Sequence, residues 1–325
     1  MSSSAPPVVC PSDGQQIAAV NGTLVCPRGH AWSVRLGVPR MIPSARTYAD
    51  AFGLQWNVYR KTQLDSHTGE PISRVRARRC LGEEAWNQLS HHSGTDVLEV
   101  GCGAGRFTEI LLAEGARVTS VDLSTAVEAN QANFPQDERH RVLQADVMQL
   151  PFAPGQFDIV FCLGVIQHTP SPEATIAKLY EQVRPGGWLV LDHYAYSLSS
   201  LTKSRWLFRL ILRRMSPERG LRYTERLVKL FFPLHRAVRK HRVAQALLSR
   251  ISPVTAYFHS YKLSDELHRQ WSLLDTHDSL TDWYKRRRTK GQIRRTLERL
   301  GAVDLTCEYG GNGVEARCRR AGPVS

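Results

Sequence analysis

The stretch that decides the fold runs from Val97 to Phe107 and is VLEVGCGAGRF. An apolar run that contains one acid, Glu99, is followed by three glycines spaced G-x-G-x-G and then by a helical pattern. This order predicts a buried strand that turns sharply into a helix whose amide end faces a ligand. Dinucleotide sites have the spacing G-x-G-x-x-G, and a carboxylate inside the turn would repel a pyrophosphate but attract a cationic group. The stretch therefore favours a nucleotide-like ligand that carries an amino group.

Two further acids end the strands that follow. Asp122 ends the run RVTSVD, and Asp146 follows the run VLQA. The carboxyl ends of parallel strands meet at one edge of a sheet, so both acids are expected beside the glycine turn. Asp122 is placed as an acceptor for ribose hydroxyls. A helix cap or a solvated strand end is the alternative role of each acid.

With these elements in register, residues 97–194 resemble a class I S-adenosylmethionine-dependent methyltransferase of the type 11-like bacterial group. The resemblance implies an α/β, Rossmann-like sheet of seven strands, with S-adenosylmethionine as the cofactor. In that family an acid binds the amino group, a second binds the ribose and a third binds the adenine amine, and these roles fall on Glu99, Asp122 and Asp146. The residues that the resemblance assigns to the cofactor are Glu99, Gly101, Gly103, Gly105, Asp122, Leu123, Asp146, Val147 and Leu163.

The segment before the glycine turn contains FGLQW, which ends at Trp56, and QLD, which begins at Gln63. It resembles the helices that cover the cofactor in the same bacterial group. Arg76 is the candidate to pair with the methionine carboxylate, because a guanidinium binds a carboxylate through two hydrogen bonds. Arg74 is the second candidate, and a solvated basic helix face is the alternative for both.

Candidate catalytic residues follow the fourth and fifth strands of the expected sheet. His168 lies in the loop after FDIVFCL, and His193 and Tyr194 end the run LVLDHY. All three are expected near the transferred methyl group. A base is needed only if the accepting atom carries a proton, and His168 is the natural candidate near neutral pH. The alternative is a histidine that bonds the turn backbone and shapes the pocket.

The N-terminal region contains Cys10-Pro-Ser-Asp13 and Cys26-Pro-Arg-Gly-His30, with Asn21-Gly22 between them as a hairpin turn. Two short-spaced pairs on adjacent turns can converge on one tetrahedral ion. The pattern resembles the zinc ribbon of the ribosomal RNA guanine-N1 methyltransferases, in which a cysteine stands at the place of Asp13. The expected ligands are Cys10, Asp13, Cys26 and His30, and zinc is the second cofactor that the resemblance suggests. A small β-structure without metal is the alternative.

Most of the positive charge lies in one segment. Residues 203–250 contain 14 Lys or Arg and only two acids, whereas the whole chain has a net charge of +13. Apolar and basic residues alternate there with a helical period, which predicts helices with one apolar and one basic face. Three partners fit this pattern: an anionic membrane surface, an RNA backbone, or the chain's own substrate pocket or a partner subunit.

The composition of the 325 residues, of which 42% are hydrophobic, is that of a globular protein. No apolar run of eighteen residues occurs, and the first nine residues lack the features of a secretory signal. Seven cysteines without dense spacing fit reduced thiols. We therefore expect a cytoplasmic protein, with peripheral contact at the inner membrane face as an option for residues 203–250.

These observations predict five parts and one principal function. The parts are a zinc-ribbon-like segment (1–45), pre-motif helices (46–92), the cofactor-binding core (93–194), a basic helical cap inserted after strand five (195–288), and a last helix with a β-hairpin (289–325). The expected function is methyl transfer to oxygen or nitrogen of a small-molecule, glycan or lipid-linked acceptor. An RNA base methyltransferase and a non-catalytic partner-binding protein are the alternatives.

Overall fold

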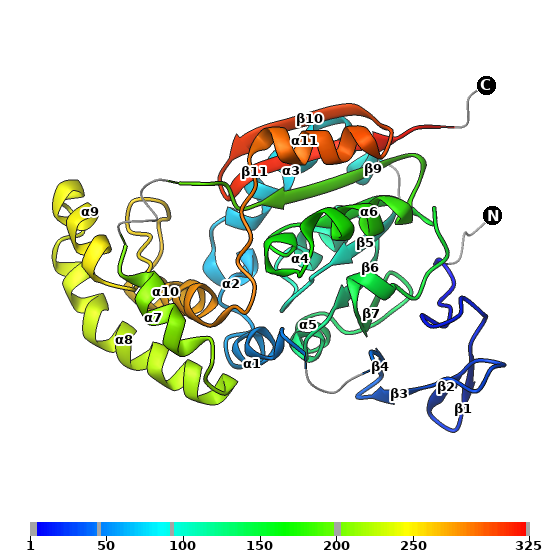
Figure 1. Cartoon of the computed structure of the whole chain (residues 1–325), viewed down its shortest axis with the longest axis horizontal. Coiled ribbons are helices and arrows are strands. Elements are labelled where there is room, and N and C mark those ends of the chain that lie inside the picture. The colour runs from blue at the N-terminus through cyan, green and yellow to red at the C-terminus, as the bar shows by residue number, and fades with distance from the viewer. Residues whose placement is uncertain (1–4, 44–46, 92–93, 198–202, 323–325) are drawn as a thin grey trace.

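The computed structural model describes residues 5–43, 47–91, 94–197 and 203–322. Within them, one mixed sheet contains eleven strands in the order β1-β2-β3-β4-β7-β6-β5-β8-β9-β11-β10. Figure 1 shows helices on both faces of this sheet and a separate group of helices at one end of the molecule. The architecture is α/β and Rossmann-like, as the sequence predicts.

The middle of the sheet is parallel. Its strands are β7 (His140–Ala145), β6 (Arg117–Asp122), β5 (Asp96–Val100), β8 (Phe157–Cys162) and β9 (Val183–His193). Three helices connect them, namely α4 (Thr108–Ala113), α5 (Ala126–Asn133) and α6 (Pro172–Gln182). The chain proceeds outward from β5 to β7 and then returns to add β8 on the other side of β5. A ligand cleft is expected at this reversal, beyond the carboxyl ends of the strands.

The sheet is larger than the predicted seven strands because the N-terminal strands join it. These strands are β1 (Ala18–Val20), β2 (Thr23–Val25), β3 (Ala31–Arg35) and β4 (Val38–Met41). β4 pairs in parallel with β7, with Arg40 opposite Gln144. Asn21 and Gly22, both with positive φ, make the tight turn between β1 and β2. The N-terminal segment is therefore continuous with the core sheet.

The other edge of the sheet is antiparallel. After α11 (Lys290–Arg299), the strands β10 (Ala302–Gly310) and β11 (Gly313–Arg320) form a hairpin, and β11 pairs with β9. Consecutive residues of β5, Val97 and Leu98, belong to different apolar clusters because side chains alternate across a strand. One cluster packs under α6 and α11, and the other packs under α3 and α4.

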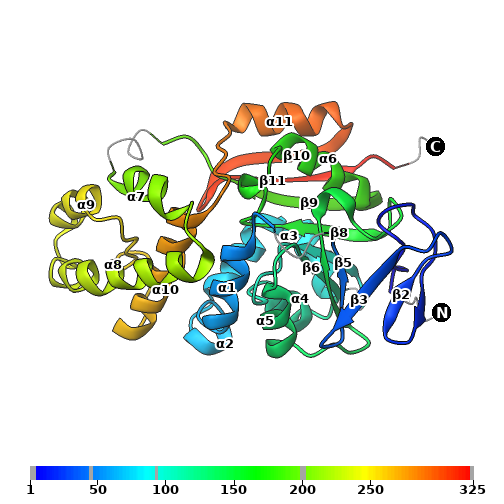
Figure 2. The same cartoon turned by 60° about the horizontal axis from the view of Figure 1, so that its bottom comes forward.

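Three helices precede β5: α1 (Asp50–Val58), α2 (Asp65–Thr68) and α3 (Ile72–His91), which is interrupted at Gly82. A helical segment, residues 205–281, follows β9 and comprises α7 (Arg205–Leu212), α8 (Pro217–Ala237), α9 (Arg242–Ile251) and α10 (Asp265–Thr281). Figures 1 and 2 both place α7, α8 and α9 at the end of the molecule opposite β1 to β3, with α1 and α10 toward the sheet. The predicted boundaries at 45/46 and 92/93 fall on residues outside the described ranges. No helix of the described residues has the length and apolarity that crossing a bilayer requires.

Candidate active site

A cavity of about 760 Å³ lies at the carboxyl ends of the parallel strands. Its wall combines the loops after β5, β6, β7 and β8 with residues of α1, α3, α10 and the chain just before α10. The helical segment and the sheet thus share one cavity. Ten of the predicted cofactor and catalytic residues lie on its wall: Arg76, Gly101, Gly103, Asp122, Leu123, Asp146, Val147, Leu163, His168 and Tyr194.

The glycine turn forms a narrow part of this wall. Gly101, Gly103 and Gly105 all have positive φ, a backbone conformation that residues with a side chain rarely adopt. A Cβ on Gly101 would lie 2.1 Å from a Val165 methyl carbon. Gly105 does not line the cavity, and a Cβ there would collide with the Phe134 ring at 2.6 Å. The turn therefore needs glycine for close approach, on the cavity side at Gly101 and on the protein side at Gly105.

Asp122 and Asp146 reach the wall while also bonding nearby backbone. Asp122 accepts hydrogen bonds from the Gly103 amide at 3.0 Å and the Ser124 amide at 2.8 Å, and burial raises its pKa. Asp146 accepts from the Met148 amide at 2.9 Å at the start of a short 3-10 turn. Asp146 therefore caps the short turn as the alternative predicted, whereas Asp122 does not cap α5, and both acids also line the cavity.

Glu99 lies beneath the turn and is not among the residues that line the cavity. One of its oxygens accepts from the Thr108 hydroxyl at 2.5 Å and from the Ser120 hydroxyl at 3.0 Å, and the other has no hydrogen-bond partner. Burial raises the pKa of Glu99 to about 7. Direct contact with a ligand amino group, as the sequence predicts, therefore does not fit its position.

Arg76 lines the cavity but already has a protein partner. Its guanidinium pairs with Asp192, which also accepts from the Gly164 amide at 2.6 Å and from the Asn312 amide at 3.2 Å. Asp192 is fully buried. Arg74, the second candidate, pairs with Glu114. Neither arginine is left free for a ligand carboxylate by these contacts.

Arg106, which the sequence reasoning missed, is a partly buried cation on the cavity wall. It donates to Ser73 at 3.0 Å and to Gln63 at 3.2 Å, and it lies over the Trp271 ring. No carboxylate among the described residues forms an ion pair with it. Burial and the neighbouring Arg76 charge lower its pKa to about 10. Its position directly after the glycine turn, on the cavity wall, is the signal that could have identified it.

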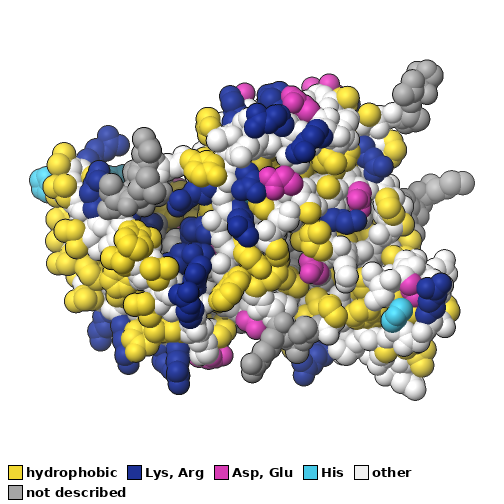
Figure 3. Space-filling view, viewed as in Figure 1, with side chains coloured by type: hydrophobic (Ala, Val, Ile, Leu, Met, Phe, Trp, Pro, Cys, Tyr) yellow, Lys and Arg dark blue, Asp and Glu magenta, His cyan; other side chains and the backbone are white. Residues whose placement is uncertain are grey.

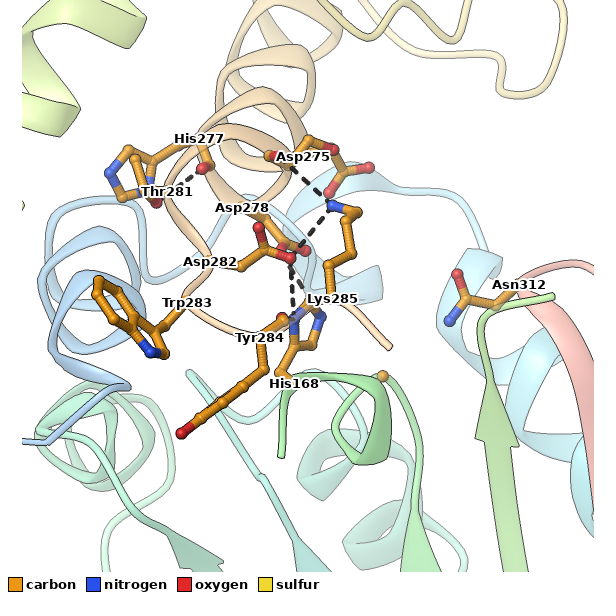
Figure 4. Close-up of polar contacts among 12 residues, drawn as sticks. His168, Asp275, His277, Asp278, Thr281, Asp282, Trp283, Tyr284, Lys285 and Asn312 are labelled. Carbon is orange, nitrogen blue, oxygen red and sulfur yellow. Dashed lines mark hydrogen bonds and ion pairs between the residues drawn. The ribbon is translucent and has the colours of Figure 1, made fainter. Parts of the chain in front are cut away.

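His168, in the short turn Ile166–His168 after β8, lies between Asp278 of α10 and Asp282, the residue that follows α10. Its Nδ1 is 3.2 Å from the Tyr284 carbonyl oxygen and 3.3 Å from Asp282 Oδ2, and its Nε2 is 3.6 Å from Asp278 Oδ1 (Figure 4). A carbonyl can only accept, so Nδ1 carries the proton of the neutral ring and Nε2 keeps its lone pair. Nε2 has no hydrogen-bond partner.

The electrostatics of His168 follow from these neighbours. Burial is the largest influence and lowers the pKa of His168, but the charges of Asp278 and Asp282 together outweigh it and raise the pKa above its ordinary value. Burial alone would raise the pKa of Asp282, yet Lys285, His168 and Arg209 lower it to about 2. Arg209 of α7 donates to Asp282 at 2.7 Å, and Lys285 lies 3.2 Å from it. Asp282 is thus a buried permanent anion beside the imidazole.

His168, Asp278 and Asp282 could each offer a metal ligand within 4.8 Å of the others. Their arrangement does not fit a divalent ion, because the two acids face opposite nitrogens of one ring. In addition, Arg209 and Lys285 already neutralise Asp282. The cluster is better suited to moving a proton than to holding a metal.

Tyr194 and His193, the other two catalytic candidates, separate in the structure. The Tyr194 ring lines the cavity and packs edge-on against His168, with centroids 5.5 Å apart. His193 is fully buried on β9, its Nδ1 lies 2.9 Å from the Tyr194 carbonyl oxygen, and it does not line the cavity. A direct catalytic role of His193 is therefore not supported by its position.

The N-terminal residues Cys10, Asp13, Cys26 and His30 converge as a second cluster, away from the cavity. His30 Nδ1 lies 3.5 Å from Cys10 Sγ, 3.3 Å from Cys26 Sγ and 3.2 Å from Asp13 Oδ2. Cys26 Sγ lies 3.4 Å from the same Asp13 oxygen. Four ligand atoms of the types that zinc prefers therefore face one point.

Comparison with known proteins agrees with this geometry. The family model described as a methyltransferase domain matches residues 98–191. Residues 98–191 of this chain are thus similar to a methyltransferase domain. The residues present fit S-adenosylmethionine, the cofactor that the sequence predicts: a glycine turn that a Cβ would obstruct, two acids on the wall, and the partly buried Arg106, for which no ion pair is formed among the described residues.

Similar proteins cover only part of the chain. The ubiquinone biosynthesis O-methyltransferase of Psychrobacter arcticus is 34% identical over 106 residues, which are 31% of this chain and 41% of that protein. The enzyme of the same name from Pseudomonas entomophila is 35% identical over 99 residues, 29% of this chain and 42% of that one. The chain thus spans less than half the length of these relatives. A solved S-adenosylmethionine-dependent methyltransferase from Mesorhizobium loti has a TM-score of 0.44 at 14% identity and covers 76% of this chain and 98% of that one.

Proposed function

We propose that the protein transfers a methyl group from S-adenosylmethionine to a hydroxyl oxygen of a polar small-molecule, glycan or lipid-linked acceptor. The observation that carries the proposal is that His168 lines the cavity and that its buried Nε2, 3.6 Å from Asp278 Oδ1, has no hydrogen-bond partner, whereas Nδ1 is bonded to the Tyr284 carbonyl. The names of the relatives, which are O-methyltransferases, support oxygen as the accepting atom.

When bound, S-adenosylmethionine supplies an electrophilic methyl group on a sulfonium. Asp122 offers its carboxylate to the ribose and Asp146 to the adenine amine. Arg106 offers its unpaired charge to the methionine carboxylate, because Arg76 is held by Asp192. These assignments leave His168 and Tyr194 for the acceptor side of the cavity.

His168 removes the acceptor's hydroxyl proton as the oxygen attacks the methyl carbon. Nε2 of His168 takes the proton, and bound S-adenosylmethionine would supply the methyl group and keep the electrons of the bond that breaks. Asp278 and Asp282 stabilise the imidazolium that forms, since both lie within 3.6 Å of a ring nitrogen. Positioned general bases of this kind typically contribute 10²–10⁴-fold to the rate.

The wall beyond His168 is polar and aromatic, which favours an acceptor with several hydroxyl groups. Trp271 and Tyr261 line the cavity with ring centroids 5.0 Å apart, and the Tyr257 hydroxyl donates to Asp275. Burial raises the pKa of Asp275 to about 6. Rings that stack on a planar or sugar ring, next to carboxylates that accept from hydroxyls, are typical of sites for polar cyclic ligands.

The test is methyl transfer from methyl-labelled S-adenosylmethionine to a cell extract separated into small-molecule, glycan, lipid and RNA fractions. Label is expected in one of the first three fractions and should require His168. Label confined to RNA would replace the proposed acceptor with a nucleic acid. Cofactor binding without label in any fraction would contradict catalysis and favour the non-catalytic alternative.

We also propose that Cys10, Asp13, Cys26 and His30 bind a structural zinc ion. Tetrahedral bonds of about 2.0–2.3 Å place neighbouring ligand atoms roughly 3.3–3.8 Å apart. Four of the six distances between these atoms are 3.2 to 3.5 Å, and all four atoms lie within 4.8 Å of one another, which is close to such a tetrahedron. Aspartate at the place of a cysteine keeps the ligand count at four.

Metal analysis of the chain purified without chelator is expected to give about one zinc per molecule. Cys26→Ser should lose the zinc, whereas Cys307→Ser, a buried cysteine of β10, should keep it. Zinc near zero in the unmodified chain would remove the proposal. A cytoplasmic location also remains a prediction.

A further inference from the structure

The helical segment exposes an unusual amount of apolar surface. Ten of the eighteen large hydrophobic side chains that are exposed in the described residues lie on α7, α8 and α9. They are Trp206, Leu207, Leu210 and Ile211 of α7, Tyr223, Leu230 and Leu234 of α8, and Val243, Leu247 and Ile251 of α9. We name these ten residues the helical apolar surface. Figure 3 shows apolar side chains gathered at this end of the molecule, with Lys and Arg beside them.

α9 carries its apolar stripe on the outside. Val243, Leu247 and Ile251 are four residues apart and lie on one helix face, and they are 74%, 59% and 70% exposed. No residue of α9 is buried. A surface helix normally turns such a stripe toward the core. The stripe of α9 therefore lacks a partner within the described chain.

α7 also exposes apolar side chains, while one of its residues contacts the interior of the protein. Its only buried residue is Leu212, and Arg209 reaches inward to Asp282. Trp206, Leu210 and Ile211 remain exposed. α8 differs, because Val228 and Phe232 pack with Val254 and Leu273 in a small core. That core holds α8 in place, so the part of the helical apolar surface that lies on α8 belongs to a well-packed helix.

The positive charge beside the helical apolar surface distinguishes between the possible partners. Residues 203–250 carry 14 Lys or Arg against Glu218 and Glu225. Two copies that met through this surface would bring the same cations together, because a two-fold interface uses the same patch on both partners. An RNA backbone would pair with the cations but would leave aliphatic side chains without a role, since single-stranded nucleic acids stack on aromatic rings.

We propose that the helical apolar surface docks on an anionic lipid bilayer, with α7 and α9 lying in the interface. Basic amphipathic helices bind there by inserting apolar side chains among the headgroups while Lys and Arg contact anionic lipids. Arg205 of α7 lines the cavity, and its neighbour Trp206 belongs to the surface. The bilayer would thus lie next to the cavity wall that α7 provides. The proposal does not depend on methyl transfer.

The experiment is flotation of the purified full chain with vesicles of phosphatidylcholine alone and of phosphatidylcholine with 30% phosphatidylglycerol. Binding to the anionic vesicles is expected, with at least tenfold weaker binding to the neutral ones. Raising the salt concentration should weaken it further. The variants Ile211→Asp and Leu247→Asp, both at exposed positions, should each lower binding at least tenfold.

The matched control is Leu36→Asp, which places the same charge on a leucine in the turn between β3 and β4 that is more exposed than either test position. It should leave flotation unchanged. Lys229→Gln and Arg242→Gln should each weaken binding roughly fivefold, because one surface cation contributes about that factor. Circular dichroism of each variant establishes that it is folded.

Three results would overturn the proposal. The first is no flotation with anionic vesicles at low salt, and the second is equal loss of flotation in Leu36→Asp and Leu247→Asp. The third is a stable dimer in solution that Ile211→Asp dissociates, which would identify a second copy as the occupant. Flotation without methyl transfer would leave this proposal standing and refute only the proposed activity.

Discussion

Replacing His168 with asparagine tests the proposed base most directly. The asparagine amide reaches the position of Nδ1 and can still donate to the Tyr284 carbonyl, but it has no atom at the place of Nε2. Asp282 keeps Arg209 and Lys285, whereas Asp278, whose side chain is 23% exposed, loses its contact with the ring. The change therefore removes the proton acceptor together with the neighbour of Asp278.

The expected loss follows from the two acids beside the ring. General bases contribute about 10²–10⁴-fold. Opposite charges about 4 Å apart attract by about 4 kcal/mol at an effective dielectric of about 20, before the cost of burial. Asp278 and Asp282 lie at 3.6 and 3.3 Å from the ring nitrogens and stabilise the imidazolium formed in the reaction. We expect kcat to fall about 10³-fold, which corresponds to about 4 kcal/mol at 1.36 kcal/mol per factor of ten.

The assay is the initial rate of label transfer at saturating cofactor, with cofactor affinity measured separately by calorimetry. Affinity should change less than about threefold. His193→Asn is the matched control, because His193 has the same carbonyl contact and an unpartnered Nε2 but lies outside the cavity. It should retain kcat per folded molecule. A threefold or smaller loss in His168→Asn, or an equal loss in both variants, would refute the reasoning.

Three further predictions concern pH, cofactor affinity and stability. Activity should rise with pH as His168 loses its proton. The midpoint should lie above the ordinary histidine value of about 6.5, because Asp278 and Asp282 outweigh burial and the charge of Lys285. Asp278→Asn should move the midpoint of the kcat/KM profile to lower pH, and an unmoved midpoint would exclude His168 as the titrating group. Arg106→Gln should weaken cofactor binding about tenfold or more, since hydrogen bonds to charged groups contribute about 1.5–3 kcal/mol. Arg76→Gln should instead lower the melting temperature, because it leaves Asp192 buried and without its cation. Calorimetry measures the first effect and thermal melts the second, and finding the two effects exchanged between the variants would contradict these roles. Burial raises the pKa of Glu99 to about 7, so the folded chain should lose stability as pH rises from about 4.3, the unperturbed value, through 7. The Glu99→Gln variant should not show that loss, and it should melt at a higher temperature than the parent at pH 8 but not at pH 5. Equal melting temperatures at pH 8 would contradict an ionised Glu99.

Local patterns predicted the parts of the site that lie within one strand and its turn. The G-x-G-x-G spacing requires positive φ, and an acid at the end of an apolar run projects from the carboxyl edge of a parallel sheet. Gly101, Asp122 and Asp146 therefore lie on the cavity wall as expected. Glu99 differs because alternation along β5 turns it toward Thr108 and Ser120 beneath the turn.

Long-range pairings could not be predicted in this way. β4 joins β7, about a hundred residues later, and no periodicity within either strand encodes that choice. Asp282 lies 114 residues beyond His168 in the chain, so its role depends on how α10 returns to the sheet. Asp192 could have been suspected, because an acid inside the apolar run LVLDHY needs a buried cation, and Arg76 supplies it.

One helix links the two proposals while keeping them separable. α7 uses Arg209 to hold Asp282, and thereby the anion beside His168, whereas its exposed face belongs to the helical apolar surface. A substitution at Ile211 changes only the exposed face, so Ile211→Asp should lose vesicle binding and keep turnover on a water-soluble acceptor. Arg209→Gln should do the reverse, because it weakens the anion at Asp282 without removing an apolar side chain. If both variants lost both properties, α7 would be a single folding unit whose integrity, rather than its two faces, governs the protein.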